Sequence, residues 1–352
     1  MKTLKFIFSS LFSNEKIINE SKKQPWWLAI VLILFSCVIA LIPNFVSVMT
    51  VQGSNVITTN TNSGIDYGLK QFSVEYLSKP ENKLYIENEK LILANTASKT
   101  SIDDYYLLDE VKHNETISLA VYYVDFTEQE SAQYKTFNEK LSKVITKIKA
   151  SRPITDTTES NLYSSLILGK ETVFLMLCNK DAKCSFKANA DGSFTISNET
   201  GILNNMSGNY VDINKDLANL NSYYSGNTES EKVNNAYNKW KLFFDKAYES
   251  PRNSLAWKYV GIYFGMDIAT ALIMGLMLFL LSKTKASLIK YRFLEALKMV
   301  FFAAVSPALI ALILGFMVPS FQSMAFLMCY ILRITWLGMK ATNPPSTQAV
   351  RK

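Results

Sequence analysis

Charge is what this sequence of 352 residues most lacks, and the lack is concentrated in a few stretches. Charged residues make up 19% of the chain and hydrophobic residues 49%, whereas globular domains average about 25% charged residues. No charged residue occurs in residues 26–49 or 299–332, and residues 259–282 contain only Asp267. Apolar runs of this length are typical of membrane-spanning helices. The sequence therefore indicates an integral membrane protein and excludes a soluble enzyme.

The sequence also lacks the residue patterns of known catalytic and metal sites. It contains one histidine, His113, and no serine or cysteine constellation can be built around it. It has no glycine-rich phosphate loop, and its four scattered cysteines lack the spacing of a zinc site. The acidic cluster at residues 103–110 lacks the spacing of a calcium-binding loop and predicts a solvated loop. We therefore expect no enzymatic activity, no metal ion and no cofactor.

The third uncharged run is too long to be one membrane-spanning helix. At about 1.5 Å per residue it would reach roughly 50 Å, against a hydrocarbon core of about 30 Å. Val318-Pro319-Ser320 is the best break, because proline removes a helical hydrogen bond and restricts the residue before it. The sequence thus predicts a polytopic α-helical protein with transmembrane helices at residues 26–50, 257–282, 296–317 and 320–339. Three spans and a re-entrant hairpin form the alternative.

Close to these helices, lysine and arginine occur in residues 1–25, 283–295 and 340–352. An even number of spans places all of these segments on one side of the membrane, and basic segments mark the cytoplasmic side. We therefore expect a bacterial plasma-membrane protein with both termini in the cytoplasm and residues 51–256 outside the cell. Attraction to anionic lipid accounts for the formal net charge of +7, so no nucleic acid partner is expected.

The N-terminal segment before the first predicted span is amphipathic. Spacings of three and four residues place its apolar side chains on one helical face, at Leu4, Ile7, Phe8, Leu11 and Phe12. This pattern favours a helix that lies on the inner leaflet. A docking face for a cytoplasmic partner is the alternative interpretation.

The segment between the first and second spans is predicted to be an extracellular α+β domain, long enough to bury its own core. Its beginning, residues 51–63, is rich in small polar residues, which indicates a linker. Alternating or β-branched runs predict strands at residues 72–77, 84–86, 91–93, 117–126, 172–178, 186 and 194–196. Helices are expected at residues 127–149 and 229–248.

The cysteines divide between the spans and this domain. Cys37 and Cys329 lie in apolar runs, where thiols behave as small hydrophobic groups. Cys178 and Cys184 lie in the predicted extracellular domain, where a disulfide can persist. A bridge between them and a flexible loop with free thiols both fit the sequence.

Small residues recur at every fourth position along the second and third predicted spans. Such stripes let helices approach closely. They predict helix packing at Gly261, Gly265, Ala269, Gly275, Ala303, Pro307, Ala311 and Gly315. Pro307 is also expected to kink its helix, either as a structural feature or as part of a moving element.

Asp267 and Arg333 are the charges that the span assignment forces into the membrane. A charge at mid-membrane costs about 2.5–3.5 kcal/mol on insertion scales, so such residues usually pair or face a polar cavity. Their depths are compatible, at roughly 15 and 20 Å from the outer face. We therefore predict an intramembrane charge pair of structural character. The alternative is that Arg333 extends toward the cytoplasm while Asp267 is protonated.

Several short motifs occur in a fixed order along this topology. They are Phe8-Ser9-Ser10-Leu11-Phe12, Leu41-Ile42-Pro43, Phe72-Ser73-Val74-Glu75, Glu295-Ala296-Leu297-Lys298 and Ser306-Pro307. The pattern resembles a domain-of-unknown-function family of membrane proteins in low-GC Gram-positive bacteria and mollicutes. Some members are labelled maltodextrin-utilisation proteins, and the helical part is similar to the Yip-like membrane superfamily. The family has no established catalytic residues to transfer to this chain.

The resemblance implies a non-enzymatic accessory or binding protein of solute uptake, with carbohydrate as one candidate solute. The expected partners are the lipid bilayer and other membrane or transporter proteins, and the sequence does not identify a ligand for the outer domain. The topology is also similar to FtsX/MacB-like ABC permeases, which a separate cytoplasmic ATPase drives. A receptor or scaffold with an extracellular binding domain is the third interpretation.

Overall fold

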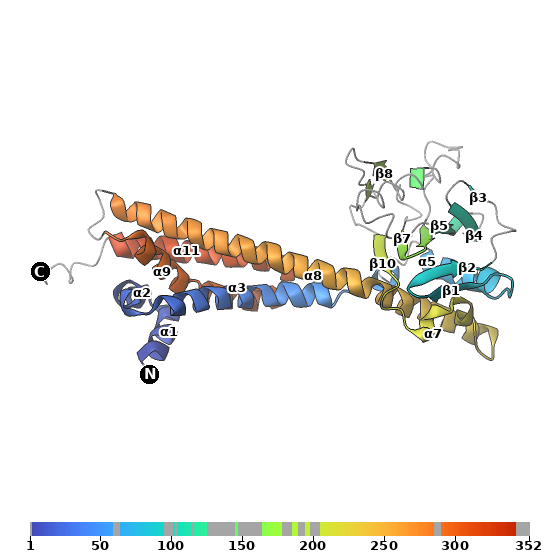
Figure 1. Ribbon diagram of the computed structural model, residues 1–352, viewed down its shortest axis with the longest axis horizontal. Helices are drawn as coiled ribbons and strands as arrows, with labels where there is room; N and C mark the ends of the chain where they lie inside the picture. Colours follow the sequence, from blue (N-terminus) through green and yellow to red (C-terminus); the bar gives the residue numbers. More distant parts are fainter. Residues whose placement is uncertain are drawn as a thin grey trace, which may run out of the picture. The chain divides into compact units, whose positions relative to one another are not determined.

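The computed structural model describes residues 2–58, 64–94, 101–102, 105–113, 116–124, 145–146, 164–177, 185–188, 194–197, 205–284 and 290–342. The chain divides into two compact units. We call residues 1–50 and 254–352 the helical unit, and residues 51–253 the sheet domain. The β strands of the described residues all lie between the first and second long apolar helices in the chain order (Figure 1).

Among the described residues, four helices are long and apolar enough to cross a membrane, judged by length and composition. Their elements are α3 (Trp26–Met49), the C-terminal part of α8 (Glu229–Lys283), α9 (Phe293–Ala303) with α10 (Val305–Met317), and η6 (Pro319–Phe321) with α11 (Gln322–Thr342). Helices α3, α10 and α11 pack against one another. The turn between the third and fourth helices is at Val318, where the chain leaves α10 just before Pro319.

The predicted end of one helix, near Tyr248, is wrong. The sequence predicted a helix that ends near Tyr248 and a separate span from residue 257, but the structure has one helix from Glu229 to Lys283. Pro251 lies inside this helix, where it removes one amide donor. The residues on both sides of the proline are helical, and Ala247 before it and Ala256 after it are both buried. The helix therefore continues across the proline.

The N-terminal segment forms α1 (Lys2–Phe12), α2 (Asn14–Glu20) and the 3-10 turn η1 (Ser21–Lys23). Phe6 is buried, and its ring meets that of Phe302 edge to face, with 4.9 Å between centroids. Leu4, Phe8 and Phe12 are exposed. The expected single apolar face is therefore divided between a side that packs on the helical unit and a side that is free.

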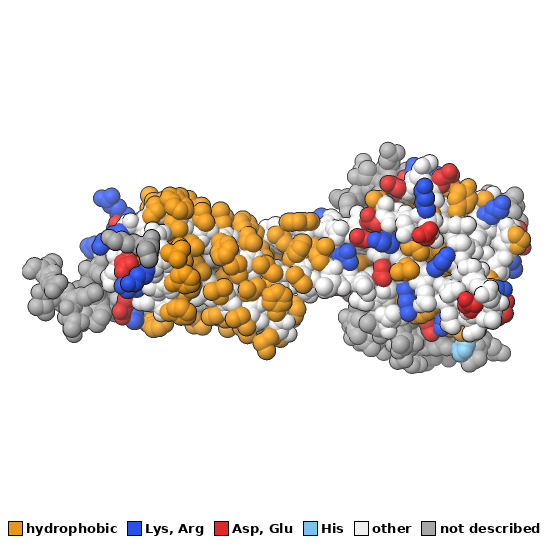
Figure 2. All heavy atoms as spheres, turned by 90° about the horizontal axis from the view of Figure 1, so that it is seen from below, with side chains coloured by type: hydrophobic (Ala, Val, Ile, Leu, Met, Phe, Trp, Pro, Cys, Tyr) orange, Lys and Arg blue, Asp and Glu red, His pale blue; other side chains and the backbone are white. Residues whose placement is uncertain are grey.

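The surfaces of the two units differ in chemistry. Figure 2 shows hydrophobic side chains over most of the visible helical unit, with charged side chains gathered at the end where α2 and α9 lie. Exposed members of this apolar surface include Leu276, Ile313 and Met324. The sheet domain instead shows Lys, Arg, Asp and Glu mixed with other residues (Figure 2). An apolar band that ends in charged residues is the surface that a bilayer requires.

The sheet domain is built on a six-stranded sheet with the strand order β10-β7-β6-β5-β4-β3. Its strands are β3 (Ser101–Ile102), β4 (Tyr105–His113), β5 (Thr116–Val124), β6 (Ser165–Gly169), β7 (Thr172–Met176) and β10 (Asn205–Asn209). Strands β5 and β6 are parallel, and all other neighbours are antiparallel. The sequence predicted β5 and β7 but missed β3, β4, β6 and β10.

Both predicted hairpins are confirmed. They are β1–β2 (Leu84–Glu87 and Lys90–Leu93) and β8–β9 (Ser185–Ala188 and Phe194–Ser197), each antiparallel. In the first, Glu87 opposes Lys90, and the two turn residues Asn88 and Glu89 have φ of 50° and 62°. Positive φ at both central residues is the geometry that matches the twist of two-residue hairpins.

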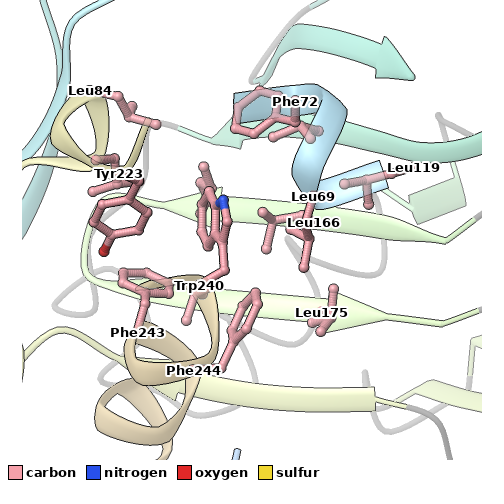
Figure 3. Packing of buried hydrophobic residues seen from close by; sticks show 14 of the residues in the cluster. Leu69, Phe72, Leu84, Leu119, Leu166, Leu175, Tyr223, Trp240, Phe243 and Phe244 are labelled. Carbon is pink, nitrogen blue, oxygen red and sulfur yellow. The ribbon is translucent and has the colours of Figure 1, made fainter. Parts of the chain in front are cut away.

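The core of the sheet domain gathers aromatic residues of α8 against the sheet. Trp240 and Phe243 are fully buried in one cluster with Leu166 of β6 and Leu175 of β7 (Figure 3). The Trp240 Nε1 donates to Ser73 Oγ at 3.0 Å, so its polar atom is satisfied inside the core. Because α8 supplies these rings, its N-terminal part is a structural element of the sheet domain.

One predicted strand is wrong. Residues 72–77 lie in α5 (Ile65–Phe72) and the π-helical turn η3 (Ser73–Leu77). The buried positions Ile65, Leu69, Phe72 and Tyr76 recur at spacings of three and four, which is the helical period. Residues 72–77 alone alternate between apolar and polar side chains and include aromatic residues, which is the pattern of a strand. The helical spacing of the buried residues is visible only over the longer stretch 65–77.

The prediction of a linker at residues 51–63 is also wrong for its described residues, 51–58. Residues 55–58 form the short helix α4 (Asn55–Thr58). The Ser54 amide donates to Asp245 Oδ1 at 2.7 Å, and a Cβ on Gly53 would lie 2.1 Å from the Phe244 carbonyl oxygen. This stretch therefore packs closely on α8. The helix predicted at residues 127–149 lies outside the described residues except for 145–146, which are helical.

Candidate ligand-binding cleft

A cleft of about 850 Å³ lies in the sheet domain between segments that are far apart in the sequence. One wall is the stretch from Leu77 to Ile86, which leads from η3 into β1. The other wall contains α7 (Lys215–Ala218) and residues of the 3-10 turn η5 (Leu220–Tyr223), and Lys232 of α8 completes the lining. Small-molecule sites commonly occupy about 300–1,000 Å³, so the cleft has the size of a ligand site.

Asn221 joins the two walls. Its side-chain amide donates to the carbonyl oxygens of Leu77 at 2.8 Å and Asn82 at 2.6 Å. Its Oδ1 accepts from the Leu84 amide at 2.8 Å. One side chain thereby holds the end of η3, the following turn and the start of β1. This side chain fixes the relative position of the two walls without a ligand.

The lining of the cleft is basic. It includes Lys79, Lys83, Lys215 and Lys232 but no aspartate, glutamate, histidine or cysteine. Lys232 forms an ion pair with Glu229 at 3.0 Å. Lys79, Lys83 and Lys215 are exposed, and none of the ion pairs among the described residues involves them. The cleft thus contains ammonium groups that form no ion pair with the described acidic residues.

Two tyrosines add flat apolar surface to this basic lining. They are Tyr85 on β1 and Tyr224, which follows η5. The Tyr224 hydroxyl is hydrogen-bonded to the Glu229 carboxylate, and the Lys232 Nζ lies 5.5 Å from the Tyr224 ring centroid. Tyr224, Glu229 and Lys232 therefore form one connected group at the edge of the cleft.

Asp109 lies on β4, not in the solvated loop that the sequence predicted. Its Oδ2 is buried without a hydrogen-bond partner. Burial, followed by the charge of Glu75, raises the pKa of the Asp109 carboxyl above its usual value. The Glu110 amide and the charge of Lys79 oppose this rise but do not cancel it. Lys79 therefore has a nearby acidic group, but the two form no ion pair.

Arg333, predicted to pair with Asp267, is placed in a different network. Its guanidinium donates to Asn14 Oδ1 at 3.3 Å and to the Ala303 carbonyl oxygen at 3.1 Å. It is also hydrogen-bonded to the Ser10 carbonyl oxygen and to Ser306 Oγ. We call Arg333, Ser10, Asn14, Ala303 and Ser306 the arginine junction. All of its acceptors are neutral oxygens.

The arginine junction explains how the third membrane helix accommodates its proline. Pro307 has no N–H, so the carbonyl of Ala303, four residues earlier, loses its helical donor. The helix is interrupted between α9 and α10 at Ala304, and Arg333 supplies a donor to the free carbonyl. The Ser10 carbonyl lies in the last turn of α1, where carbonyls also lack helical partners. Arg333 thus satisfies the ends of two helices.

Asp267 is buried in α8, with 6% of its surface exposed. None of the hydrogen bonds or ion pairs among the described residues joins it to Arg333. The predicted charge pair is therefore not formed in this structure. The depth estimate treated the spans alone, whereas the N-terminal segment folds against them and provides the acceptors for Arg333.

The predicted packing residues divide into two groups. A Cβ on Gly275 would lie 2.7 Å from Leu297 Cδ1, and one on Gly315 would lie 2.8 Å from Pro43 Cβ, so helices approach closely at both positions. Ala303, Pro307 and Ala311 are buried. Gly261 and Gly265 have nothing within 4 Å of an added Cβ, and Ala269 is exposed. This first stripe makes no helix contact within the described chain.

The remaining predicted residues contribute no site. Cys178 and Cys184 lie outside the described residues, so their bridge stays a prediction. Cys37 is buried and Cys329 half-buried, both as free thiols. His113 ends β4, half-buried, with its ring 4.5 Å from that of Tyr67. Within the described ranges, no group of three or more His, Cys, Asp and Glu residues could hold a metal ion.

Sequence reasoning did not single out the cleft lysines. Lys79 and Lys83 are separated from Lys215 and Lys232 by more than a hundred positions, and a lysine in a polar segment is usually a solvated surface residue. No signal in the sequence reveals that Asn221 joins the segments that carry them. Comparison of the chain with protein-family models, curated proteins and solved structures found no match. The family resemblance therefore stays a prediction.

Proposed function

We propose that this chain is a multi-pass plasma-membrane protein whose sheet domain binds a ligand, and that it acts as a non-enzymatic accessory protein of solute uptake. The observation that carries this proposal is the cleft held by Asn221, which has the volume of a ligand site. Binding is preferred to catalysis because the lining has lysine, asparagine and tyrosine but no carboxylate, histidine or cysteine. Such a lining can orient a ligand, and it lacks the imidazole and carboxylate groups that most often act as general bases.

The proposed topology places both termini in the cytoplasm and residues 51–256 outside the cell. Four apolar helices and basic flanking segments support it. The test is labelling of intact cells with a membrane-impermeant maleimide, in a background without Cys178 and Cys184. A cysteine at exposed Lys112 should react, and Ser287→Cys should react only after the cells are permeabilised. Reaction of Ser287→Cys in intact cells would reverse the orientation.

Binding in the cleft is tested with a variant that fills it. Ala218 lines the cleft and is half-buried, so Ala218→Trp should occupy the space without removing a core contact. The full chain in lipid nanodiscs would be titrated with maltotetraose, a neutral probe, and with a short poly(glycerol phosphate), an anionic probe. We expect at least one probe to bind the natural protein and not the Ala218→Trp variant. Binding of neither probe, or equal binding to the filled cleft, would contradict the proposal.

A second candidate function is a permease-like subunit moved by a cytoplasmic ATPase. One observation favours it, the uninterrupted helix α8, which contains both core residues of the sheet domain and an apolar span. Affinity purification from the native host followed by mass spectrometry separates the candidates. Recovery of an ATPase subunit supports the permease-like function, and recovery of a solute transporter or solute-binding protein supports the accessory function.

A further inference from the structure

The charged residues that line the cleft are all of one sign. Some lysines on other faces have acidic partners, as Lys90 with Glu171 at 3.3 Å and Lys246 with Glu249 at 2.8 Å, whereas Lys112 and Lys241 form no ion pair with a described residue. Of the lysines that line the cleft, Lys232 alone forms an ion pair with a described residue. Unpaired surface lysines are common, so one of them would carry no argument. The informative feature is that Lys79 and Lys83 from one wall and Lys215 from the other line a single cleft whose lining contains no acidic residue.

Lysines placed together in one cleft do not by themselves stabilise the folded state. Like charges that line one cleft repel one another, and low-dielectric walls concentrate their potential. Lys79 and Lys83 belong to one wall and Lys215 to the other, and the hydrogen bonds of Asn221 hold these walls together. A ligand that carries negative charge would relieve the repulsion, and ammonium groups bind oxyanions through short charge-assisted hydrogen bonds.

We infer that the ligand of the cleft is anionic and carries more than one phosphate or carboxylate group, an inference that rests on the proposed binding function. The volume of about 850 Å³ exceeds the needs of a single inorganic anion. Tyr85 and Tyr224 provide surface for the uncharged part of such a ligand. A phosphate-linked polyol or a charged sugar derivative has this combination of groups, whereas a neutral oligosaccharide leaves the lysines unused.

The test uses the full chain in nanodiscs of neutral lipid, which remove competition from anionic headgroups at the basic termini. Calorimetric titration with poly(glycerol phosphate) would be compared between the natural protein and a triple variant, Lys79→Gln with Lys83→Gln and Lys215→Gln. The control triple carries Lys90→Gln, Lys112→Gln and Lys241→Gln, which change charge equally but do not line the cleft. Thermal unfolding of each variant confirms that it folds.

We expect the cleft triple to bind the anionic probe roughly tenfold more weakly or worse, because hydrogen bonds to charged groups are lost. The control triple should bind as the natural protein does, and added salt should weaken natural binding. Equal anion binding by the two triples would overturn the inference. Binding of maltotetraose that Ala218→Trp abolishes but the cleft triple preserves would also overturn it, while the proposed binding function would stand. Binding of neither probe would contradict both.

Discussion

Two groups of cations in this protein differ in their partners. Arg333 lies within the helical unit and has its guanidinium hydrogen-bonded to oxygens of α1, α2 and the α9–α10 break. The cleft lysines of the sheet domain face a cavity with no acidic residue in its lining. A half-buried cation with four hydrogen bonds to protein oxygens, such as Arg333, is a structural element. Cations that converge without partners point to a ligand.

The largest effect is expected at the arginine junction. Arg333→Gln should lower the free energy of unfolding by roughly 3 kcal/mol, because hydrogen bonds to a charged group are lost and buried carbonyls are left without donors. Unfolding in detergent micelles, followed by circular dichroism during denaturant titration, measures this loss.

Lys23→Gln is the matched control for charge removal, because Lys23 is exposed on η1. It should change stability by less than about 0.5 kcal/mol. If Arg333→Gln is no less stable than this control, the arginine junction has no structural role, and Arg333 does not differ from the cleft lysines in the way described. The Arg333→Gln variant that remains folded should still bind ligand in the cleft.

The next effect concerns the glycines of the predicted packing stripes. Gly315→Ala places a methyl group 2.8 Å from Pro43 Cβ, and overpacking of this kind costs about 1–3 kcal/mol. Gly265→Ala meets nothing within 4 Å and should be neutral or slightly stabilising, because alanine favours helices by up to about 1 kcal/mol over glycine. Thermal unfolding of the two variants in the same detergent measures the contrast. Equal losses would mean that Gly265 also lies in a helix contact.

A smaller effect is expected at Asp109, whose raised pKa means that the folded state binds a proton more readily than the unfolded chain. Stability from this group therefore increases as pH falls through its folded pKa and levels off below the unfolded value of about 3.9. Asp109→Asn should raise the melting temperature at pH 7 and lose this advantage in acid. Asp216→Asn on exposed α7 is the control. An equal gain at both pH values would show that charge is not the cause.

The smallest effect is the coupling between Asp267 and Arg333. Because the structure forms no pair between them, the stability losses of Asp267→Asn and Arg333→Gln should add within about 0.5 kcal/mol. A double-mutant cycle measures this quantity. A double variant that loses much less than the sum of the single losses would restore the charge pair that the sequence predicted.

The helical unit was easier to predict from the sequence than the sheet domain. A long uncharged run in a bilayer must satisfy its own backbone hydrogen bonds, which a helix does. The apolar helices and the turn near Pro319 therefore follow from composition. Strands β4, β6 and β10 were missed because their pairing depends on contacts far away in the sequence. The same limit applies to both cation groups. Neither the acceptors of Arg333 nor the meeting of Lys79 with Lys215 is encoded in any local pattern.

The most direct test of the ligand-binding cleft is an experimental structure of the full chain with poly(glycerol phosphate) bound. The account predicts the probe between Tyr85 and α7, with phosphate oxygens within about 3 Å of the Nζ atoms of Lys83 and Lys215. It also predicts that Arg333 keeps its contacts with Asn14 and Ala303. A structure in which the phosphates lie only on the basic segments of the helical unit, and the cleft holds no probe, would contradict it.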